Sequence, residues 1–258
     1  IRLSLVGSEM CIRDSFVPIR SEDGEFLPGI GGEDDGLKGG LNGIDNGRLH
    51  FTRVRIPRTN LLNRYGDVDE NGVYSSPIAS PGRRFFTMLG TLVQGRVSLS
   101  MASAAASALA LKGAITYGNQ RRQFNATSDT HEEVLMDYQL HHRRLIDRLA
   151  RTYADTFASN ELLEKFDAVF SGAEDTDDDR QELETLAAAI KPLVTWNGLD
   201  TLQECREACG GAGFMAKNRF ASLRADLDIY TTFEGDNNIL LQLAVSYTHL
   251  RAHETKAN

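Results

Sequence analysis

The chain has 258 residues, and its 28 Lys and Arg against 36 Asp and Glu give a formal net charge of −8. This negative balance argues against a general nucleic-acid or anionic-membrane binder, because such proteins present a basic surface. Hydrophobic residues make up 41% of the sequence, which is enough for a sizeable core. The longest uncharged stretch in the middle, 97–111, is too short to span a bilayer and contains four serines, so no membrane span is expected.

Neither end of the chain has the pattern of a folded segment. Residues 1–15 carry an early arginine and a short apolar run, but they lack the long apolar region and the cleavage site of a signal peptide. Residues 246–258 are polar and have no periodicity. Both segments resemble translated adaptor sequence at the edges of truncated gene fragments. We therefore expect a non-native leader at 1–15 and a non-native tail at 246–258.

Glycine and proline mark off residues 16–80 as a β-rich unit. Eleven of the 23 glycines and four of the six prolines fall in this segment, which is typical of short strands and turns. Residues 49–56 predict a strand whose apolar side chains change phase between Phe51 and Val54. A bulge, or burial of both faces of the strand, would account for the change.

From residue 81 onward the sequence is typical of helices. Residues 84–119 contain no proline and place apolar side chains at helical spacing. Within them, the run 101–108 has only small side chains after Met101, which would let a neighbouring helix approach closely.

Three further helices are expected. One begins near Thr130, where Thr130 and Glu133 have the spacing of a capping box. The next covers 181–209 with an interruption near Pro192, and the last begins near Gly235. Short connections between four helices are typical of a bundle. The predicted fold is mainly α: a C-terminal helical bundle domain at 81–245, preceded by part of a middle β-domain at 16–80.

Several polar motifs have simpler explanations than a metal or ligand site. The segment 174–184 carries seven acids and one arginine without the spacing of a calcium loop, so a solvated inter-helix loop is favoured. Residues 141–144 (HHRR) are read as a solvated helix face, because adjacent histidines on a helix point apart. Cys205 and Cys209 lack further zinc ligands and are expected to pack in the core. No metal site is predicted.

Glu234 is the most informative acid in the chain. It lies beside Phe233 and before Gly235, which permits a tight turn into an apolar helix. Either it stabilises the N-terminus of that helix, or it is a partly desolvated carboxylate that acts as a general base. These residues alone favour the first interpretation. The glycines at 210–213 mark a helix stop and could also let a large ligand touch the backbone.

Several motifs, taken together, resemble a known family. They are the segments CREACGGAGF (205–214), TFEGDN (232–237), KGGLNGIDNG (38–47), VRIPR (54–58) and RRQF (121–124). Their sequence and order resemble acyl-CoA oxidases within the acyl-CoA dehydrogenase superfamily, over 16–245. From the resemblance we expect this sequence to lack counterparts of the family's N-terminal helical domain, of the first half of its β-domain and of a further C-terminal helical domain.

The resemblance implies roles for individual residues. Glu234 matches the base that removes the α-proton of a fatty acyl-CoA thioester, its backbone N–H would bind the thioester carbonyl, and Arg96 matches a substrate-side arginine. Arg121 matches the arginine that pairs with the FAD pyrophosphate. The cofactor-binding residues implied are Arg121, Gln123, Phe124, Gly210, Gly211, Asp236 and Asn238.

The implied reaction is FAD-dependent oxidation of fatty acyl-CoA to trans-2-enoyl-CoA, in which electrons pass to molecular oxygen and give hydrogen peroxide. Asp236 stands where dehydrogenases usually have threonine, which favours the oxidase branch. The alternatives are a dehydrogenase that uses an electron-transfer flavoprotein and an inactive helical association fragment. A homodimer is implied, because the arginine motif and the double glycine serve the neighbouring subunit's FAD in this superfamily. The expected location is the bacterial cytoplasm, or the peroxisome for a eukaryotic protein.

Overall fold

The structure, a computed structural model, describes residues 14–81, 84, 87, 90, 92–125 and 128–254. The chain divides into two compact units. One contains residues up to 38 and 42–91, and the other contains 39–41 and the chain from 92 onward.

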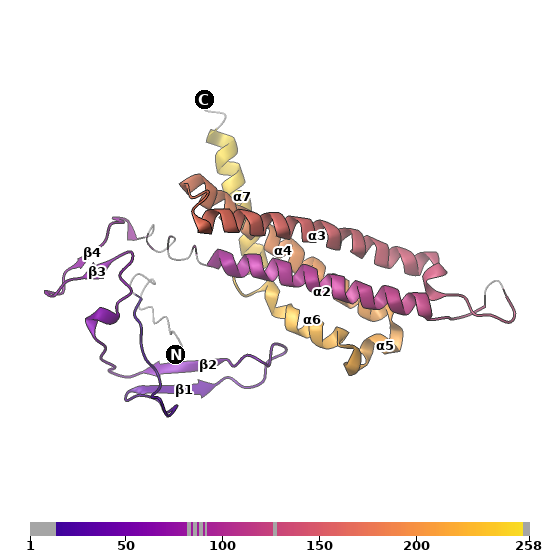
Figure 1. The fold of residues 1–258 in the computed structure, drawn as a ribbon, viewed down its shortest axis with the longest axis horizontal. Coiled ribbons are helices and arrows are strands. Elements are labelled where there is room, and N and C mark those ends of the chain that lie inside the picture. The colour runs from indigo at the N-terminus through magenta and orange to yellow at the C-terminus, as the bar shows by residue number, and fades with distance from the viewer. Residues whose placement is uncertain are drawn as a thin grey trace. The chain divides into compact units, whose positions relative to one another are not determined.

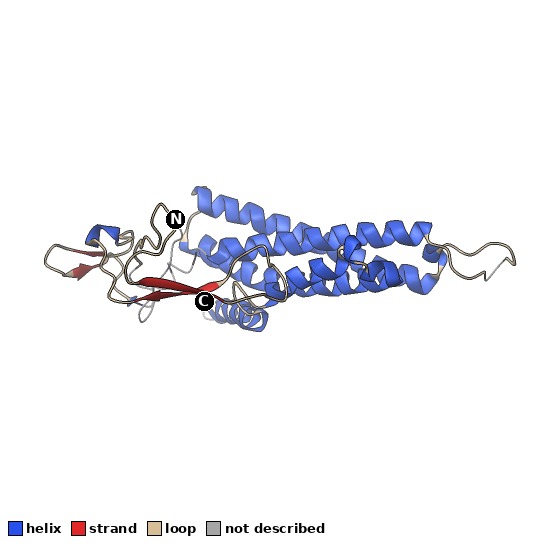
Figure 2. Cartoon of the chain, turned by 90° about the horizontal axis from the view of Figure 1, so that it is seen from below, coloured by secondary structure: helices blue, strands red, loops and turns tan. Residues whose placement is uncertain are grey.

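The first unit is built from two small antiparallel sheets (red in Figure 2). Strand β1 (Ile30–Asp34) pairs with β2 (Gly47–Phe51), with Ile30 opposite Phe51. Strand β3 (Asp67–Val68) pairs with β4 (Tyr74–Ser75), and a short 3-10 helix, η1 (Arg58–Asn60), lies between the two sheets in the sequence. A small apolar cluster supports the first sheet and consists of Val17, Ile19 and Ile30, with Phe26, Leu27, Phe51, Val54 and Ile56 packed against it.

The strand predicted at 49–56 is shorter than expected. It ends at Phe51, and Arg53 has a left-handed φ of 52°, which breaks the extended backbone. The change of apolar phase between Phe51 and Val54 therefore marks the end of the strand. Val54 and Ile56 still pack on the apolar cluster, from the irregular segment that follows.

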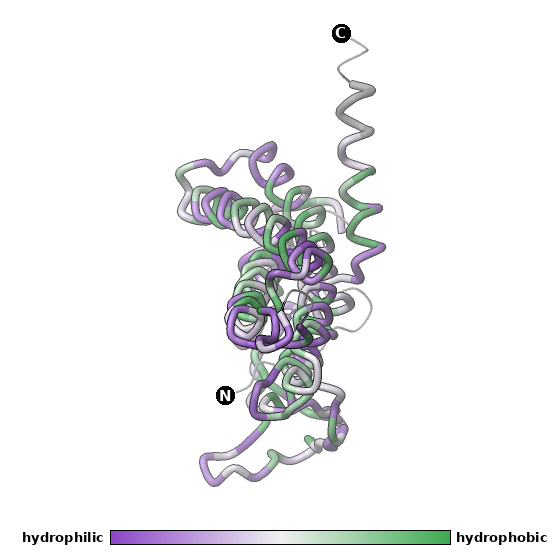
Figure 3. Tube along the Cα trace, turned by 90° about the vertical axis from the view of Figure 1, so that its right-hand side faces the viewer, coloured by the Kyte–Doolittle hydropathy of each residue, from purple (hydrophilic) through white to green (hydrophobic). Residues whose placement is uncertain are grey.

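The second unit is helical, as predicted. Its long helices are α2 (Leu92–Gln120), α3 (Gln139–Ser171), α4 (Asp177–Ala208) and α7 (Asn237–Glu254). Its short elements are η2 (Leu135–Asp137), α5 (Gly210–Phe214), η3 (Ala216–Asn218), α6 (Phe220–Asp228) and η4 (Ile229–Thr231). Helices α2, α3 and α4 lie side by side with alternating direction, and α7 packs on α4 across that direction (Figures 1 and 3).

Helices α2 and α4 are brought together by small side chains. Ser100, Ser103 and Ser107 on α2 are fully buried, and a Cβ added at Gly198 on α4 would lie 3.3 Å from the Cβ of Ser103. The close approach expected for the small-residue run of α2 is therefore confirmed. Green and purple residues alternate along the bundle helices in Figure 3, as in helices with one buried and one solvated face.

Helix α2 is also long and apolar enough to cross a membrane by length and composition alone. Its most apolar window has a mean hydropathy of 1.3, and 44% of that window is buried inside the structure. The burial comes from packing against α3, α4 and α6, which is the arrangement of a core helix in a bundle.

Helix α3 begins nine residues later than the predicted start at Thr130. The intervening backbone pairs instead with the segment that follows α2: the amide of Gln123 donates to the Glu133 carbonyl (3.0 Å), and the amide of Leu135 donates to the backbone carbonyl of Arg121 (2.8 Å). Because Glu133 has its main chain in this pairing, the capping-box spacing of Thr130 and Glu133 does not start a helix.

Helix α4 begins earlier than predicted, inside the acidic segment 174–184. The hydroxyl of Thr176 accepts from the amide of Asp179 (3.1 Å), and the Asp179 carboxylate accepts from the amide of Thr176 (3.1 Å), which completes a capping box. Asp177 and Asp178 join Asp179 in the first turn, where negative charge stabilises a helix. The loop interpretation is wrong from Asp177 onward. At the other end of the chain, α7 continues past residue 245 to Glu254.

We predict that Ser103→Leu lowers the stability of the chain, because the larger side chain has no space between α2 and α4. Overpacking of this kind costs about 1–3 kcal/mol of unfolding free energy. The matched control is Ala105→Leu, which adds similar bulk on the exposed face of the same helix. Urea unfolding of both variants checks the prediction, and equal midpoints would contradict the tight packing at Ser103.

Candidate active site

The carboxylate of Glu234 is carried by a turn between η4 and α7. The amide of Phe233 donates to the carbonyl of Ile229 (3.1 Å), after which Glu234 and Gly235 adopt positive φ angles of 56° and 111°. Only glycine takes the second of these without strain, and a Cβ there would lie 2.9 Å from Leu240. The two left-handed residues reverse the chain within one turn and direct the Glu234 side chain toward α2.

Gly95 on α2 makes room for this carboxylate. A Cβ at Gly95 would lie 2.5 Å from Cδ and 2.6 Å from Oε2 of Glu234, so no larger residue fits without moving the acid. Oε2 is buried and has no hydrogen-bond partner among the described residues. The backbone N–H of Glu234 likewise donates to no acceptor in the described part of the chain. The turn thus presents an unused carboxylate oxygen beside an unused N–H donor.

Arg96 holds the same turn from α2. Its Nε donates to the backbone carbonyl of Glu234 (3.0 Å) across 138 residues of sequence. Burial lowers the pKa of Arg96, and the nearby carboxylates of Glu184 and Glu234 partly offset this effect. A role for Arg96 toward the substrate stays a prediction.

Lys191 on α4 contacts the same turn, and the sequence reasoning missed it. Its side chain is fully buried, and Nζ donates to the carbonyl of Gly235 (2.8 Å) and to Oδ1 of Asn237 (2.9 Å). The Asn237 amide in turn donates to the hydroxyl of Thr195 (3.0 Å). Its position in the helix could have indicated its burial: Lys191 lies four residues after the buried Ala187 and therefore on the same inward face of an amphipathic helix.

Asp236 and Asn238, both predicted to bind the cofactor, lie at the start of α7. Oδ1 of Asp236 accepts from the amides of Asn238 (2.9 Å) and Ile239 (3.3 Å), so this carboxylate caps the helix. The Asn238 side chain is exposed. Contact of either residue with a cofactor stays a prediction.

The predicted residues Arg121, Gln123 and Phe124 lie together at the C-terminal end of α2. Phe124 is 68% exposed despite its size, and its φ of 59° is left-handed. The hydroxyl of Tyr138 donates to the carbonyl of Gln123 (2.7 Å) and ties this segment to the start of α3. A hollow of 280 Å³ lies beside them, lined by Gln123, Phe124, Leu135, Tyr138, Leu140, His141 and Arg144.

The segment 141–144 is only partly a solvated face. His142 and Arg143 are exposed, as expected, whereas His141 and Arg144 are half-buried. Arg144 forms ion pairs with Glu204 and Glu207 of α4, and burial lowers the pKa of His141, with a further decrease from the Arg144 charge. The prediction of a uniformly solvated face is therefore wrong, because this turn of α3 packs against α4.

Gly210 and Gly211 follow α4 at the same end of the bundle. Gly210 has a φ of 55°, and a Cβ at either position would meet no atom within 4 Å. The glycines therefore leave open space at the surface instead of making room for another helix. Cys205 and Cys209 just before them are free and buried, which confirms their packing role, and burial raises the pKa of Cys205 to about 12.

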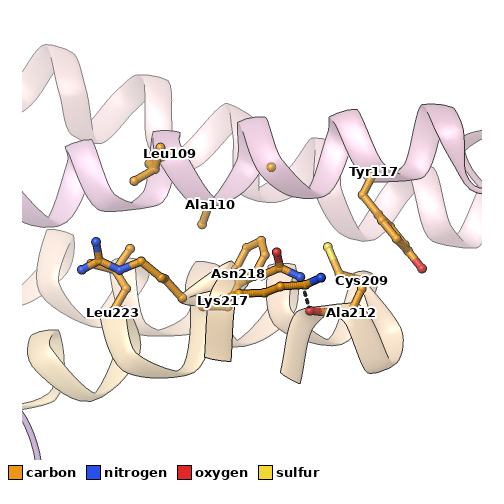
Figure 4. A pocket seen from close by; sticks show the side chains of 11 residues that line it. Leu109, Ala110, Tyr117, Cys209, Ala212, Lys217, Asn218 and Leu223 are labelled. Carbon is orange, nitrogen blue, oxygen red and sulfur yellow. Dashed lines mark hydrogen bonds between the residues drawn. The ribbon is translucent and has the colours of Figure 1, made fainter. Parts of the chain in front are cut away.

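A second hollow, of 440 Å³, lies between α2 and the elements α5 and α6 at this end (Figure 4). The Asn218 side chain donates to the carbonyl of Ala212 (2.7 Å) at its floor, and Tyr117 and Cys209 also line it. The amide of Arg121 donates to the carbonyl of Tyr117 (2.8 Å), so the hollow lies within one helical turn of the arginine motif. Among the described residues, no group of three His, Cys, Asp or Glu side chains could hold a metal ion.

The predicted site residues thus form two clusters at opposite ends of α2. One contains Glu234 and Arg96, and the other contains Arg121 and the double glycine. Arg121 comes 25 residues after Arg96 and directly follows the last residue of α2, which corresponds to about 37 Å along the helix axis at the usual rise.

The motifs and the geometry agree with a comparison against known families. A sequence profile described as the acyl-CoA oxidase C-alpha1 domain matches residues 89–249. The chain belongs to the acyl-CoA oxidase family. It is 44% identical over 238 residues to the peroxisomal acyl-coenzyme A oxidase 2 of Arabidopsis thaliana, covering 91% of this chain and 34% of that protein. It is 39% identical over 241 residues to the peroxisomal oxidase 3 of the same plant, covering 93% and 35%.

Solved acyl-CoA oxidases share the fold. Acyl-CoA oxidase 1 of Yarrowia lipolytica superimposes with a TM-score of 0.79 at 35% identity, over 90% of this chain and 35% of that one. Acyl-CoA oxidase-2 of Caenorhabditis elegans, bound with FAD, ascaroside-CoA and ATP, gives 0.85 at 27% identity, over 95% and 37%. The chain spans about a third of the length of the curated oxidases it matches.

We predict that Gly95→Ala fails to stabilise the chain. Replacing a glycine inside a helix by alanine ordinarily adds about 1 kcal/mol, but here the new methyl group would displace the Glu234 carboxylate. Gly113→Ala on the same helix is the control, because Gly113 is exposed and its added Cβ would meet only the edge of the Phe220 ring, at 3.2 Å. Thermal unfolding compares the two, and an equal gain in both variants would contradict the contact between Gly95 and Glu234.

We also predict a pH-dependent contribution of Lys191 to stability. Burial, with a further decrease from Arg96, lowers its pKa to about 8 from the ordinary 10.5. Between these values the unfolded chain binds more protons at this residue, so its contribution to the free energy of unfolding rises with pH through that window. Urea unfolding of the wild type and Lys191→Met, below and above the window, measures the difference. A difference independent of pH would contradict the lowered pKa.

Proposed function

We propose that this chain is the part of an acyl-CoA oxidase that supplies the catalytic base, and that Glu234 removes the α-proton of a fatty acyl-CoA thioester. The observation that carries the proposal is the buried Oε2 of Glu234, which has no partner in the described part of the chain and is seated on Gly95. A buried polar atom is ordinarily hydrogen-bonded, so its unused lone pairs are suited to accept a proton from a bound molecule.

The backbone beside the base supports the same chemistry. Removing the α-proton places negative charge on the thioester oxygen, and the unused N–H of Glu234 is a donor for it, in the manner of an oxyanion hole. Arg96 keeps the donor in place by holding the carbonyl of the same residue. Two groups of one residue thus bind the two reacting parts of the substrate.

The residues at the other end of α2 fit FAD. Arg121 is an exposed planar cation suited to a pyrophosphate, Phe124 presents an exposed ring, and Gly210 and Gly211 leave open space for close approach of a ligand. When bound, FAD supplies the acceptor for the hydride that leaves the substrate β-carbon. The named FAD complexes of related oxidases support its presence in this family.

The separation of the two clusters supports a homodimer. The distance from Arg96 to Arg121, about 37 Å by helical rise, exceeds the length of an extended FAD. One flavin therefore does not reach both Glu234 and Arg121 of the same chain. In the proposed dimer each chain holds the adenosine side of its partner's FAD through Arg121 and the double glycine.

The relatives favour the oxidase over the alternatives. They are named acyl-CoA oxidases, which supports molecular oxygen as the electron acceptor and hydrogen peroxide as a product, in fatty acid β-oxidation. A dehydrogenase would reduce an electron-transfer flavoprotein instead, and a non-catalytic association fragment would turn over no substrate. Relatives named peroxisomal support a peroxisomal location, and the bacterial cytoplasm stays the alternative prediction.

We predict that Glu234→Gln strongly slows proton removal and leaves flavin retention unchanged. The chain is incubated with FAD, freed of excess cofactor and examined by visible absorbance, after which octanoyl-CoA or palmitoyl-CoA is added without oxygen. The wild type should bleach the flavin band, and the variant should bleach it about 10²–10⁴-fold more slowly, as expected for loss of a general base.

Glu161→Gln, at an exposed position of α3, is the matched control and should bleach as fast as the wild type. Readmitting oxygen should then give hydrogen peroxide. Turnover without peroxide would favour the dehydrogenase alternative, and bleaching by Glu234→Gln at the wild-type rate would refute the assignment of the base.

A further inference from the structure

The turn that presents the base does not hold its shape by its own backbone preferences. Glu234 is a non-glycine residue with a φ of 56°, followed at once by Gly235 at 111°. Left-handed geometry at a residue with a side chain is strained and persists only where neighbouring groups enforce it. Groups that bind the carbonyls of these two residues can enforce the turn, because the directions of the carbonyls depend on its backbone angles.

Lys191 is such a group. Among the described residues it is the one charged side chain that is fully buried, and burying an ammonium is costly unless it is well hydrogen-bonded. Its two bonds go to the carbonyl of Gly235 (2.8 Å) and to Oδ1 of Asn237 (2.9 Å), the residues that follow the base. An ammonium has three donors and no acceptor, so it selects a turn that points both oxygens inward.

Asn237 closes this arrangement into a ring. Its Nδ2 donates to the hydroxyl of Thr195 (3.0 Å), and that hydroxyl donates to the backbone carbonyl of Lys191 (2.8 Å). Lys191 and Thr195 lie one turn apart on α4 and therefore face the same direction. With Lys191 donating to one end of the Asn237 amide and Thr195 accepting from the other, the first residue of α7 has a single orientation.

We propose that Lys191 is a positioning residue for Glu234: through Gly235 and Asn237 it fixes the left-handed turn that seats the carboxylate against Gly95. Arg96 completes the grip from α2 by holding the carbonyl of Glu234 itself. The catalytic meaning of this inference rests on the proposed function. The positioning itself is a property of the folded chain and is testable without substrate.

The first test measures order in the turn by amide hydrogen exchange in the whole chain. Reporter amides are those of Phe233, which donates to Ile229, and of Asn238 and Leu240, which donate to Asp236. In Lys191→Met these amides should exchange faster by on the order of tenfold or more, as expected for loss of bonds to a charged donor. Exchange at the far end of the bundle should stay at the wild-type rate.

Two controls separate local loosening from general destabilisation. Lys112→Met removes an exposed lysine of α2 and should change nothing in the turn. Leu145→Ala opens a cavity in the core at the far end of the bundle, so it should lower global stability without selectively exposing the three reporter amides. If Lys191→Met exchanges like Leu145→Ala, or like the wild type, Lys191 does not position the turn.

A second variant covers the case in which Lys191→Met does not fold. Thr195→Val keeps the shape of the side chain but removes the acceptor of the Asn237 amide, so the Asn238 amide should exchange faster while Lys191 is retained. Unchanged exchange at Asn238 in this variant would overturn the ring of contacts and, with it, the proposal.

The second test concerns catalysis and keeps the two proposals apart. In the FAD-loaded chain, flavin bleaching by octanoyl-CoA should show a lowered rate constant at saturating substrate in Lys191→Met, with little change in the substrate concentration for half-saturation. If the wild type itself does not bleach but Lys191→Met loosens the turn, the positioning stands and the proposed function fails. If the wild type bleaches and both its rate and the turn are unaffected by the substitution, the positioning fails and the proposed function stands.

Discussion

The close packing of α2 against α4 is the constraint on which the site depends. Fully buried serines on α2 and the bare backbone of Gly198 on α4 let the two helices approach along their length. Arg96 of α2 and Lys191 of α4 both reach the Glu234 turn, so that cationic donors from two helices bind successive carbonyls. Without those carbonyl and amide acceptors Lys191 would be buried with its charge unpaired, which is an arrangement that proteins avoid.

The helical architecture could be predicted because it depends on periodic burial, and the spacing of apolar residues along the sequence shows that period. Helix ends were less accessible, since local signals compete with long-range pairing. Thr130 and Glu133 have the spacing of a helix cap, yet the Glu133 backbone pairs with the segment after α2. The acidic segment was instead predicted as a solvated loop, but it contains the start of a helix. Negative charge at Asp177 and its neighbours is favourable in the first turn of that helix.

Residues of the candidate site could be predicted where they lie in a recognisable sequence motif. They could not be predicted where their place in the site depends only on contacts with residues distant in the sequence. Glu234 could be predicted as a candidate base because its turn sequence, 232–237, resembles that of a known family. Lys191 was not, because its partners lie 44 and 46 residues away and a lysine in a helix is usually solvated. Gly95 could not be predicted for the same reason. Its sequence neighbours do not indicate that the Glu234 carboxylate lies where a side chain at position 95 would be.

The length of α2 has a consequence for how substitutions act. Its first turns touch the residue that presents the base, and its last turn leads into the arginine motif, about 37 Å away by helical rise. In the proposed dimer these two ends belong to different reaction centres. A substitution near Arg96 then affects the reaction centre of the chain that carries it, whereas a substitution at Arg121 affects the reaction centre of the partner chain. Each copy of the protein therefore depends on residues of the other copy.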